Sequence, residues 1–213
     1  MRKLDVVCLH DEFFTDHGFV FNQSQLFFER EFAHGKQVVF VHYVEGSKGN
    51  YLAYHVAIRI NAVEELIQKY LPAPVSYAEQ SITLTQTPHN LGNIYPQRMI
   101  ISDENELSEV IHSAEDFFLK SGFHWLDQMI DPVSLEQEFL HQKENFFEPF
   151  NLVESAFRST ALSRLYNAKD YPVLRQFFLE KINSQEMTPY SIASFLKFLN
   201  YLDNLDNPVS AAA

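Results

Sequence analysis

Two histidines, three tyrosines and an arginine lie within VVFVHYVEGSKGNYLAYHVAIRI, residues 38–60. Imidazole groups exchange protons near neutral pH, and burial or neighbouring charges shift their pKa values, so such a stretch can form a chemical or a binding site. Apolar residues alternate on both sides of the glycine-rich GSKGN, which predicts the two strands of a β-hairpin. If GSKGN is a five-residue loop, antiparallel pairing places His42 opposite Tyr54 and Val41 opposite His55.

In this pairing the even-numbered residues of both strands share one face, and we expect it to be the core face because nearly all of its members are apolar. The face holds Val38, Phe40, His42, Val44, Leu52, Tyr54, Val56, Ile58 and Ile60. We expect His42 to be a buried residue that is hydrogen-bonded by Tyr54. A register slip of one residue would exchange the two faces.

The odd-numbered residues form a second face that is polar and aromatic. The preceding strand adds two carboxylates to it if Leu26, Phe28 and Phe32 join the core. The candidate site residues are Glu29, Glu31, Tyr43, Tyr51, His55 and Arg59. Three interpretations stay open: a solvated or helix-contacting face with charge pairs alone, a binding surface, or an acid–base site if burial shifts the pKa values.

Other groups of reactive side chains have simpler explanations. Residues 10–12 (HDE) are consecutive, so on a helix they point about 100° apart, and we expect them to be solvated. His112 is followed by Glu115 and Asp116 at helical spacing, which predicts a local surface pair. Cys8 is the only cysteine, so no disulfide within the chain and no cysteine-based zinc site can form. Phosphate-binding glycine loops, a nucleophile elbow and a zinc-protease helix are absent, and we expect no metal and no cofactor.

Periodicity predicts the elements that must position these side chains. Besides the hairpin, strands are expected at residues 19–32, 81–86 and 98–102. Helices are expected at residues 4–17, 62–71, 103–122, from 132 onward, 152–166, 172–182 and 189–202. Asp103, with Glu106 three residues later, is a capping signal for the helix that begins there.

Strands followed by helices indicate an α+β fold, with an antiparallel sheet of four to five strands, flanking helices and a helical C-terminal half. We expect an α+β domain over residues 1–130. We expect residues 131–213 to be a helical region that packs on this domain or forms a small helical subdomain.

The charge balance limits the classes of partner. The chain has 16 basic and 28 acidic residues and a formal net charge of −12. Without a basic stripe it is a poor candidate for binding nucleic acid, whose phosphates attract lysine and arginine. The acidity suits a basic protein partner, or serves solubility alone. No secretory signal and no run of about 18 apolar residues is present, so we expect a cytoplasmic protein outside the membrane.

The N-terminal third also carries a resemblance. The order of a helix, Gly18-Phe19, a Phe-rich strand ending in Phe27-Phe28-Glu29-Arg30, then QVVFVHYVEG and YLAYHVAIRIN resembles small bacterial α+β families of unknown function. Some of these are thought to be immunity proteins that neutralise polymorphic toxins. The resemblance covers residues 4–70. It implies a sheet-based binding module and carries over no catalytic residue.

These observations lead to two main hypotheses. The preferred one is a cytoplasmic, non-catalytic protein-binding module of the immunity type. The alternative is a hydrolase or small-molecule enzyme that uses the polar sheet face around His55. A third possibility, a structural subunit, would bury the apolar stripe of the last helix in an oligomer; the sequence itself does not predict an oligomeric state.

Overall fold

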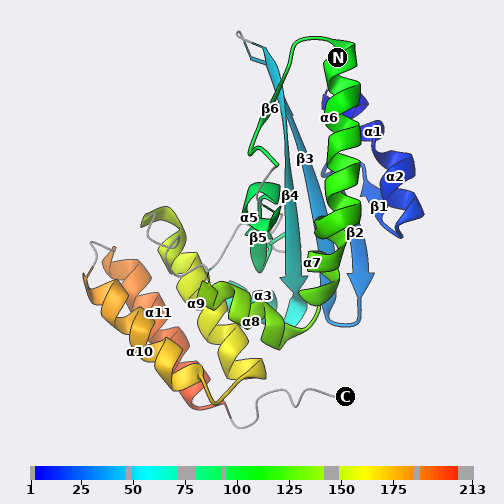
Figure 1. Cartoon of the computed structure of the whole chain (residues 1–213). Coiled ribbons are helices and arrows are strands. Elements are labelled where there is room, and N and C mark those ends of the chain that lie inside the picture. The colour runs from blue at the N-terminus through cyan, green and yellow to red at the C-terminus, as the bar shows by residue number, and fades with distance from the viewer. Residues whose placement is uncertain are drawn as a thin grey trace. The chain divides into compact units, whose positions relative to one another are not determined.

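The computed structural model describes residues 3–46, 49–71, 80–92, 95–141, 149–184 and 188–205 (Figure 1). The chain forms two compact units. Unit 1 comprises Met1–Arg59 and Leu84–Ile130, and unit 2 comprises Ile60–Thr83 and Asp131–Ala213. The expected division into residues 1–130 and 131–213 did not anticipate that residues 60–83 group with the helical unit. The α+β class, the antiparallel sheet and the helical C-terminal half are confirmed.

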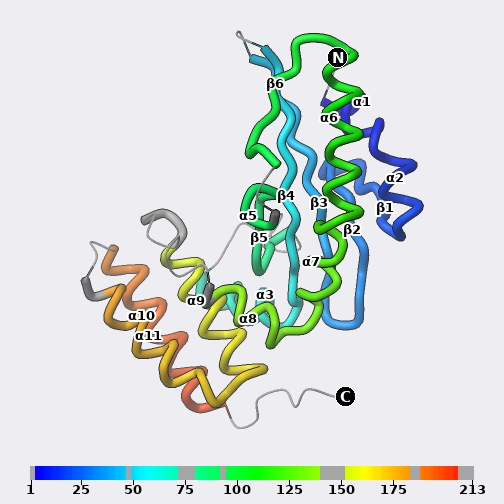
Figure 2. Tube along the Cα trace, in the orientation of Figure 1, coloured from blue at the N-terminus to red at the C-terminus, as the bar shows by residue number. Residues whose placement is uncertain are grey.

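Within the described residues the sheet of unit 1 has six strands. They are β1 (Val20–Asn22), β2 (Phe27–Phe32), β3 (Gly35–Val44), β4 (Asn50–Ile60), β5 (Leu84–Gln86) and β6 (Met99–Ile101). Strands β1 to β5 lie in sequence order, and β6 also pairs with β4. Figure 2 shows β5 and β6 beside different parts of β4, in agreement with their registers at Val56–Ile58 and Asn50–Leu52.

The prediction of a single strand over residues 19–32 is wrong, because the chain reverses direction within it. Strand β1 pairs antiparallel with β2, and Phe21 is the partner of Phe28. At the reversal the Asn22 carbonyl accepts a hydrogen bond from the Leu26 N–H at 2.8 Å, and the Asn22 side chain accepts one from the Gln25 N–H at 3.2 Å. An asparagine that binds the backbone of its own turn replaces the ladder bonds of a continuous strand.

The β3–β4 hairpin forms as expected, but its predicted register is wrong. The Gly49 N–H donates to the Gly46 carbonyl at 3.3 Å, and Gly49 has a φ of +125°. These glycines therefore face each other across a turn tighter than the assumed five-residue loop, which makes the index sum of paired residues odd instead of even. Odd-numbered residues of β3 consequently share a face with even-numbered residues of β4.

Contacts with the helices identify the core face. The side-chain amide of Gln37 in β3 donates a hydrogen bond to Asp127 at 3.2 Å. In β4, the Tyr54 ring packs against the Phe118 ring, with 6.0 Å between the ring centroids. Asp127 and Phe118 belong to one run of helices, so both strands present these residues to the same layer. The core positions, each 6% exposed or less, are Gln37, Val39, Val41, Tyr43, Leu52, Tyr54, Val56, Ile58 and Ile60.

One continuous run of helices crosses this core face (Figure 1). It consists of α6 (Glu104–Phe117), a π-helical turn η1 (Phe118–Gly122) and α7 (Phe123–Gln128). The predicted cap of α6 is confirmed, since Asp103 accepts from the Glu106 N–H at 2.9 Å and Glu106 accepts from the Ser102 N–H at 2.7 Å. Gly122 is required at the π turn, because a Cβ there would lie 2.7 Å from the Phe118 ring.

The N-terminal helix expected over residues 4–17 is broken into α1 (Lys3–Cys8) and α2 (Asp11–Asp16). The break lets the side chain of His10, which was expected to be solvated, reach the core, where it is 1% exposed. Its Nδ1–H donates to the Val6 carbonyl at 3.0 Å, so Nε2 is free to accept from the Tyr54 hydroxyl at 2.7 Å. Tyr54 therefore forms its hydrogen bond with His10. The predicted hydrogen bond between Tyr54 and His42 is wrong.

Unit 2 is built around a central helix. Helix α9 (Pro149–Tyr166) packs against α3 (Asn61–Gln68), α8 (Pro132–His141), α10 (Tyr171–Ser184) and α11 (Pro189–Asp203). The Phe157 ring of α9 contacts the rings of Phe195 and Phe198 at 5.1 and 4.8 Å. Most of the apolar stripe of the last helix is thus buried within its own chain, which removes the basis for an oligomer that depends on it.

A buried ion pair ties α3 to α9. Arg158 donates from Nε and Nη2 to both oxygens of Glu64, at 3.0 and 3.2 Å. Thr83 completes the set, because its hydroxyl donates to Glu64 at 2.9 Å and accepts from the Ile60 N–H at 2.9 Å. This bidentate geometry satisfies a carboxylate whose side chain is only 1% exposed.

We expect Arg158→Ala to lower the free energy of unfolding by about 3 kcal/mol, because it leaves the buried Glu64 carboxylate without its cation. Urea unfolding followed by circular dichroism measures the loss. Arg175→Ala is the matched control, since the ion pair of Arg175 with Asp203 has side chains 33% and 37% exposed and should contribute ~1 kcal/mol or less. Equal losses in the two variants would contradict the assigned role of the buried pair.

A second prediction concerns acid stability. Burial lowers the pKa of His10 from 6.5 to about 4. Between these two pH values the unfolded chain binds a proton at His10 that the folded chain does not bind. The free energy of unfolding should therefore fall by on the order of 3 kcal/mol as the pH drops from about 6.5 to about 4. Chemical unfolding across this pH range should show a shallower loss for His10→Gln. The exposed-residue variant His112→Ala should keep the wild-type dependence, and the same slope in His10→Gln would refute the assignment.

Candidate binding surfaces

The structure brings five of the six predicted site residues to one side of the sheet. Glu29 and Glu31 pair with Val38 and Lys36 of β3, and the odd-numbered residues of β4 contribute Tyr51, His55 and Arg59. Tyr43 does not belong to this group, because the odd index sum of the hairpin moves it to the core face, where it is 6% exposed. The same change brings His42 to the side that carries His55.

A line of rings crosses three strands on this side of the sheet. The Phe27 and Phe40 rings lie 5.4 Å apart, Phe40 stacks on His42 at 5.9 Å, and His42 meets His55 edge-on at 4.8 Å. The His42–His55 contact was not predicted, because the predicted register places the two histidines on opposite faces of the hairpin. The alternation of Phe40, His42 and Val44 correctly predicts that these residues share a face. The predicted face was the core face, whereas they lie on the opposite face.

On this side of the sheet, we call the part nearest the turn between β3 and β4 the histidine face. It consists of Phe40, His42, Val44, Tyr51, His55 and Ile100. Ile100 belongs to it because it is the strand partner of Tyr51. Val44 and Ile100 are 40% and 71% exposed, while the four rings are half-buried. The surface is therefore aromatic, as predicted, but more apolar than the polar and aromatic face that the sequence predicted.

Both imidazoles of the histidine face are neutral at pH 7. Desolvation lowers the pKa of His42 to about 4, with smaller contributions from the positive charges of His55 and Lys3. Desolvation also lowers the pKa of His55, whose Nδ1 is buried without a hydrogen-bond partner among the described residues. Uncharged imidazoles in contact behave as flat, weakly polar rings, which suits packing against another surface.

The charged residues beside the rings are held by other partners. Glu29 accepts from the Asn22 amide at 2.9 Å and pairs with Lys36 at 2.7 Å. The guanidinium of Arg98 lies over the Tyr51 ring at 5.2 Å. No ion pair joins His42 or His55 to a carboxylate within the described ranges. The acid–base constellation of His55, Glu29, Glu31 and Tyr43 is thus not assembled, since Tyr43 lies on the core face and Glu29 binds Lys36.

Acidic side chains gather on the opposite side of unit 1. We call residues 3–17 and 103–128 the helix layer. The first segment has four carboxylates and one lysine, and the second has seven carboxylates and one lysine. Phe13 and Phe14 of α2 contact Phe118 at 6.5 and 4.9 Å, so the two segments are neighbours.

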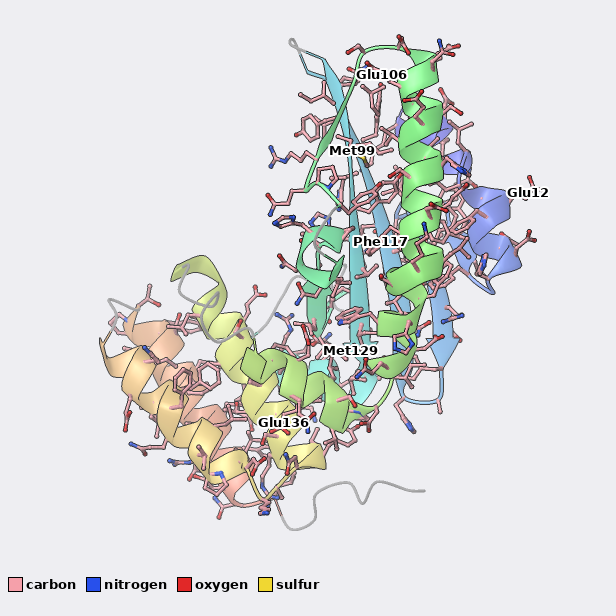
Figure 3. The ribbon with its side chains drawn as sticks, viewed as in Figure 1. Glu12, Met99, Glu106, Phe117, Met129 and Glu136 are labelled. Atoms are coloured by element: carbon pink, nitrogen blue, oxygen red, sulfur yellow. The ribbon has the colours of Figure 1, made fainter. Side chains whose placement is uncertain are left out.

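The outer surface of the helix layer is acidic with exposed leucines. Figure 3 shows Glu12 projecting from α2 away from the sheet, whereas Phe117 is directed from α6 toward it. Leu9 and Leu119 are 52% and 57% exposed among these charges. The surface pair expected around His112 is present, with His112 Nδ1 3.6 Å from Glu115 and exposed to solvent. Much of the acidic density of residues 103–116 was visible in the sequence, but its clustering with α2 was not.

Two further findings apply to the described residues. They contain no cluster of three or more histidine, cysteine, aspartate or glutamate side chains that could hold a metal ion. Within the same ranges no helix is long and apolar enough to cross a membrane.

Comparisons with protein-family models, curated proteins and solved structures find no match to this chain. The resemblance to immunity families therefore stays a prediction.

We expect His55→Ala to raise the pKa of His42 from about 4 toward 6.5, because it removes a neighbouring positive charge and opens the His42 ring to water. An NMR titration of the histidine ring protons measures this pKa. His112→Ala changes an exposed histidine on α6 and should leave the titration of His42 as it is in the wild type. An unchanged His42 pKa in His55→Ala would show that the two rings do not interact.

Proposed function

We propose that this chain is a non-catalytic module that binds a basic protein through the acidic surface of its helix layer. The observation that carries the proposal is the concentration of carboxylates there, eleven against two lysines in residues 3–17 and 103–128. A surface of one sign accelerates encounter with a partner of the opposite sign and orients it during docking. Leu9 and Leu119 supply apolar contact area within the charged surroundings, as the centres of protein interfaces require.

An immunity role deepens this proposal. A protein that neutralises a toxin by occluding it needs a complementary surface and no reaction chemistry of its own. Many nucleic-acid-degrading or membrane-active proteins are basic, because their targets are anionic. An acidic surface with exposed leucines suits such a partner. We place the encounter in the cytoplasm, since a chain with a single cysteine is built without disulfides and suits a reducing compartment.

The binding surface that we propose differs from the one expected from the sequence. Glu29 and Glu31 were the acidic candidates on the sheet, but Glu29 is neutralised by Lys36 at 2.7 Å. The carboxylates of α2 and α6, except the half-buried Glu115, are exposed, and they are more numerous. Glu109 and Glu12 are useful probes because neither takes part in a helix cap or an ion pair described above.

The test uses affinity capture to obtain a partner, followed by titration of that purified partner against variants. Glu12→Lys/Glu109→Lys should slow association by at least about tenfold at low salt, since steering by complementary charge contributes ten- to a thousandfold to association rates. Stopped-flow or surface-plasmon kinetics at two salt concentrations measure the rate constants.

The matched control is Glu65→Lys/Glu180→Lys, which makes the same change in net charge on exposed positions of α3 and α10. It should bind at nearly the wild-type rate. If both double variants lose the same amount, net charge and not the helix layer controls binding. If neither loses anything, the proposed surface is wrong.

A further inference from the structure

Helix α8 carries a glutamate that is completely buried. The Glu136 side chain is 0% exposed (Figure 3). Its Oε2 accepts a hydrogen bond from the Asn167 amide at 2.5 Å, whereas its Oε1 is buried without a hydrogen-bond partner among the described residues. Within the same residues no lysine or arginine forms an ion pair with Glu136. A buried carboxylate without a cation is unfavourable, so Oε1 indicates a further ligand.

A second carboxylate lies next to the first. The Asn167 amide also donates to Asp170 Oδ2 at 2.9 Å. Glu136 Oε2 and Asp170 Oδ2 are therefore at most 5.4 Å apart, because 2.5 and 2.9 Å separate them from the shared nitrogen. The amide thus binds one oxygen of each carboxylate, and Glu136 Oε1 and Asp170 Oδ1 are left for another ligand. Asp170 is exposed, so the pair extends from a buried side chain to the surface.

The end of helix α9 adds negative potential at the same place. This helix has 18 residues and ends immediately before Asn167. The carbonyl groups of a last turn form the negative end of the helix dipole, which favours a cation nearby. Arg164 in that turn is held elsewhere, since it donates to the Leu202 carbonyl of α11 at 2.8 Å. Two carboxylates and a helix C-terminus therefore meet without a neutralising side chain among the described residues.

A hard divalent cation matches this set of oxygens. Only two carboxylates are present, so the other ligands would be neutral oxygens and water, which Ca²⁺ and Mg²⁺ both accept. Two oxygens that bind one Ca²⁺ at ~2.4 Å lie up to about 5 Å apart, which is close to the separation of the two carboxylates. Ca²⁺ also tolerates irregular geometry. Mg²⁺ keeps several water molecules, which a completely buried carboxylate disfavours.

We propose that Glu136 and Asp170 bind one Ca²⁺ through Glu136 Oε1 and Asp170 Oδ1, while the Asn167 amide bonds to the other oxygen of each carboxylate. The cation supplies the positive charge that the buried carboxylate lacks among the described residues, and it links α8 to the turn between α9 and α10. The site is independent of the proposed function, because its residues belong to unit 2 and the helix layer belongs to unit 1.

Isothermal titration calorimetry of the full chain, with CaCl₂ and separately with MgCl₂, tests the proposal. Potassium chloride at about 0.15 M in the buffer screens the diffuse attraction of cations to an acidic protein. The wild type should bind one Ca²⁺ per chain, and it should bind Mg²⁺ less tightly. At roughly ten times the dissociation constant, Ca²⁺ should raise the Tm by about 3–6 °C, because it binds the folded state.

Two variants change the site, and a third is the matched control. Glu136→Gln should weaken Ca²⁺ binding by at least about tenfold and abolish the rise in Tm, because the amide keeps the size of the side chain but not its charge. Asp170→Asn changes an exposed residue, so it should fold as the wild type does and also weaken binding. Glu180→Gln removes an exposed carboxylate of α10 and should bind Ca²⁺ like the wild type.

Three results would contradict the proposal. A wild type that shows no saturable binding of Ca²⁺ would overturn it. It would also fail if Glu136→Gln and Asp170→Asn bind Ca²⁺ as the wild type does, or if Glu180→Gln loses as much affinity as they do, because diffuse attraction to the acidic chain would then explain the binding. Tighter binding of Mg²⁺ than of Ca²⁺ would overturn the assignment of calcium.

Discussion

The register between β3 and β4 assigns every side chain of the hairpin to its face, and the rest of unit 1 follows from that assignment. With an odd index sum, Tyr43 and Tyr54 enter the core and His42 comes to lie against His55. Tyr54 then provides the hydroxyl that satisfies buried His10, which fixes the break between α1 and α2. A slip of one residue on β3 would bury His42 and expose Tyr43, and a slip of one residue on β4 would bury His55 and expose Tyr54.

This constraint separates two kinds of surface on opposite sides of one sheet. The core face is covered by helices whose outer sides carry most of the negative charge of unit 1. The other side presents aromatic rings and exposed aliphatic residues beside the ion pair of Glu29 and Lys36. A charged surface favours fast encounter with an oppositely charged partner, whereas a neutral apolar surface favours contact that survives high salt. The two surfaces are therefore suited to different partners.

Local signals in the sequence were sufficient where the structure depends on local interactions. The hairpin strands, the Asp103 cap with Glu106 and the stripe of the last helix follow from alternation, capping chemistry and helical period, all of which act within a few residues. The α+β class could be predicted for the same reason. The strand over residues 19–32 failed because Asn22 stabilises a turn that hydrophobic alternation does not register.

The remaining errors concern contacts between residues far apart in the chain. His10 looked solvated because its partner, Tyr54, lies 44 residues away. The faces of β3 were exchanged because two glycines and an asparagine in GSKGN permit turns of different length, and a change of one residue reverses the parity. Five of the six candidate residues therefore lie on one side of the sheet, and Tyr43 does not. His42, which was predicted to lie in the core, lies on the same side as His55. The acidic residues of the helix layer form one surface because α2 contacts η1, and the sequence does not predict this contact.

The contact between the His42 and His55 rings tests the central claim about the register most directly. In a protein with selectively labelled histidine and tyrosine, NOE spectra at neutral pH should show cross-peaks between the ring protons of His42 and His55, and between His10 and Tyr54. Cross-peaks between the rings of His42 and Tyr54 in place of these would establish the even register and contradict the account.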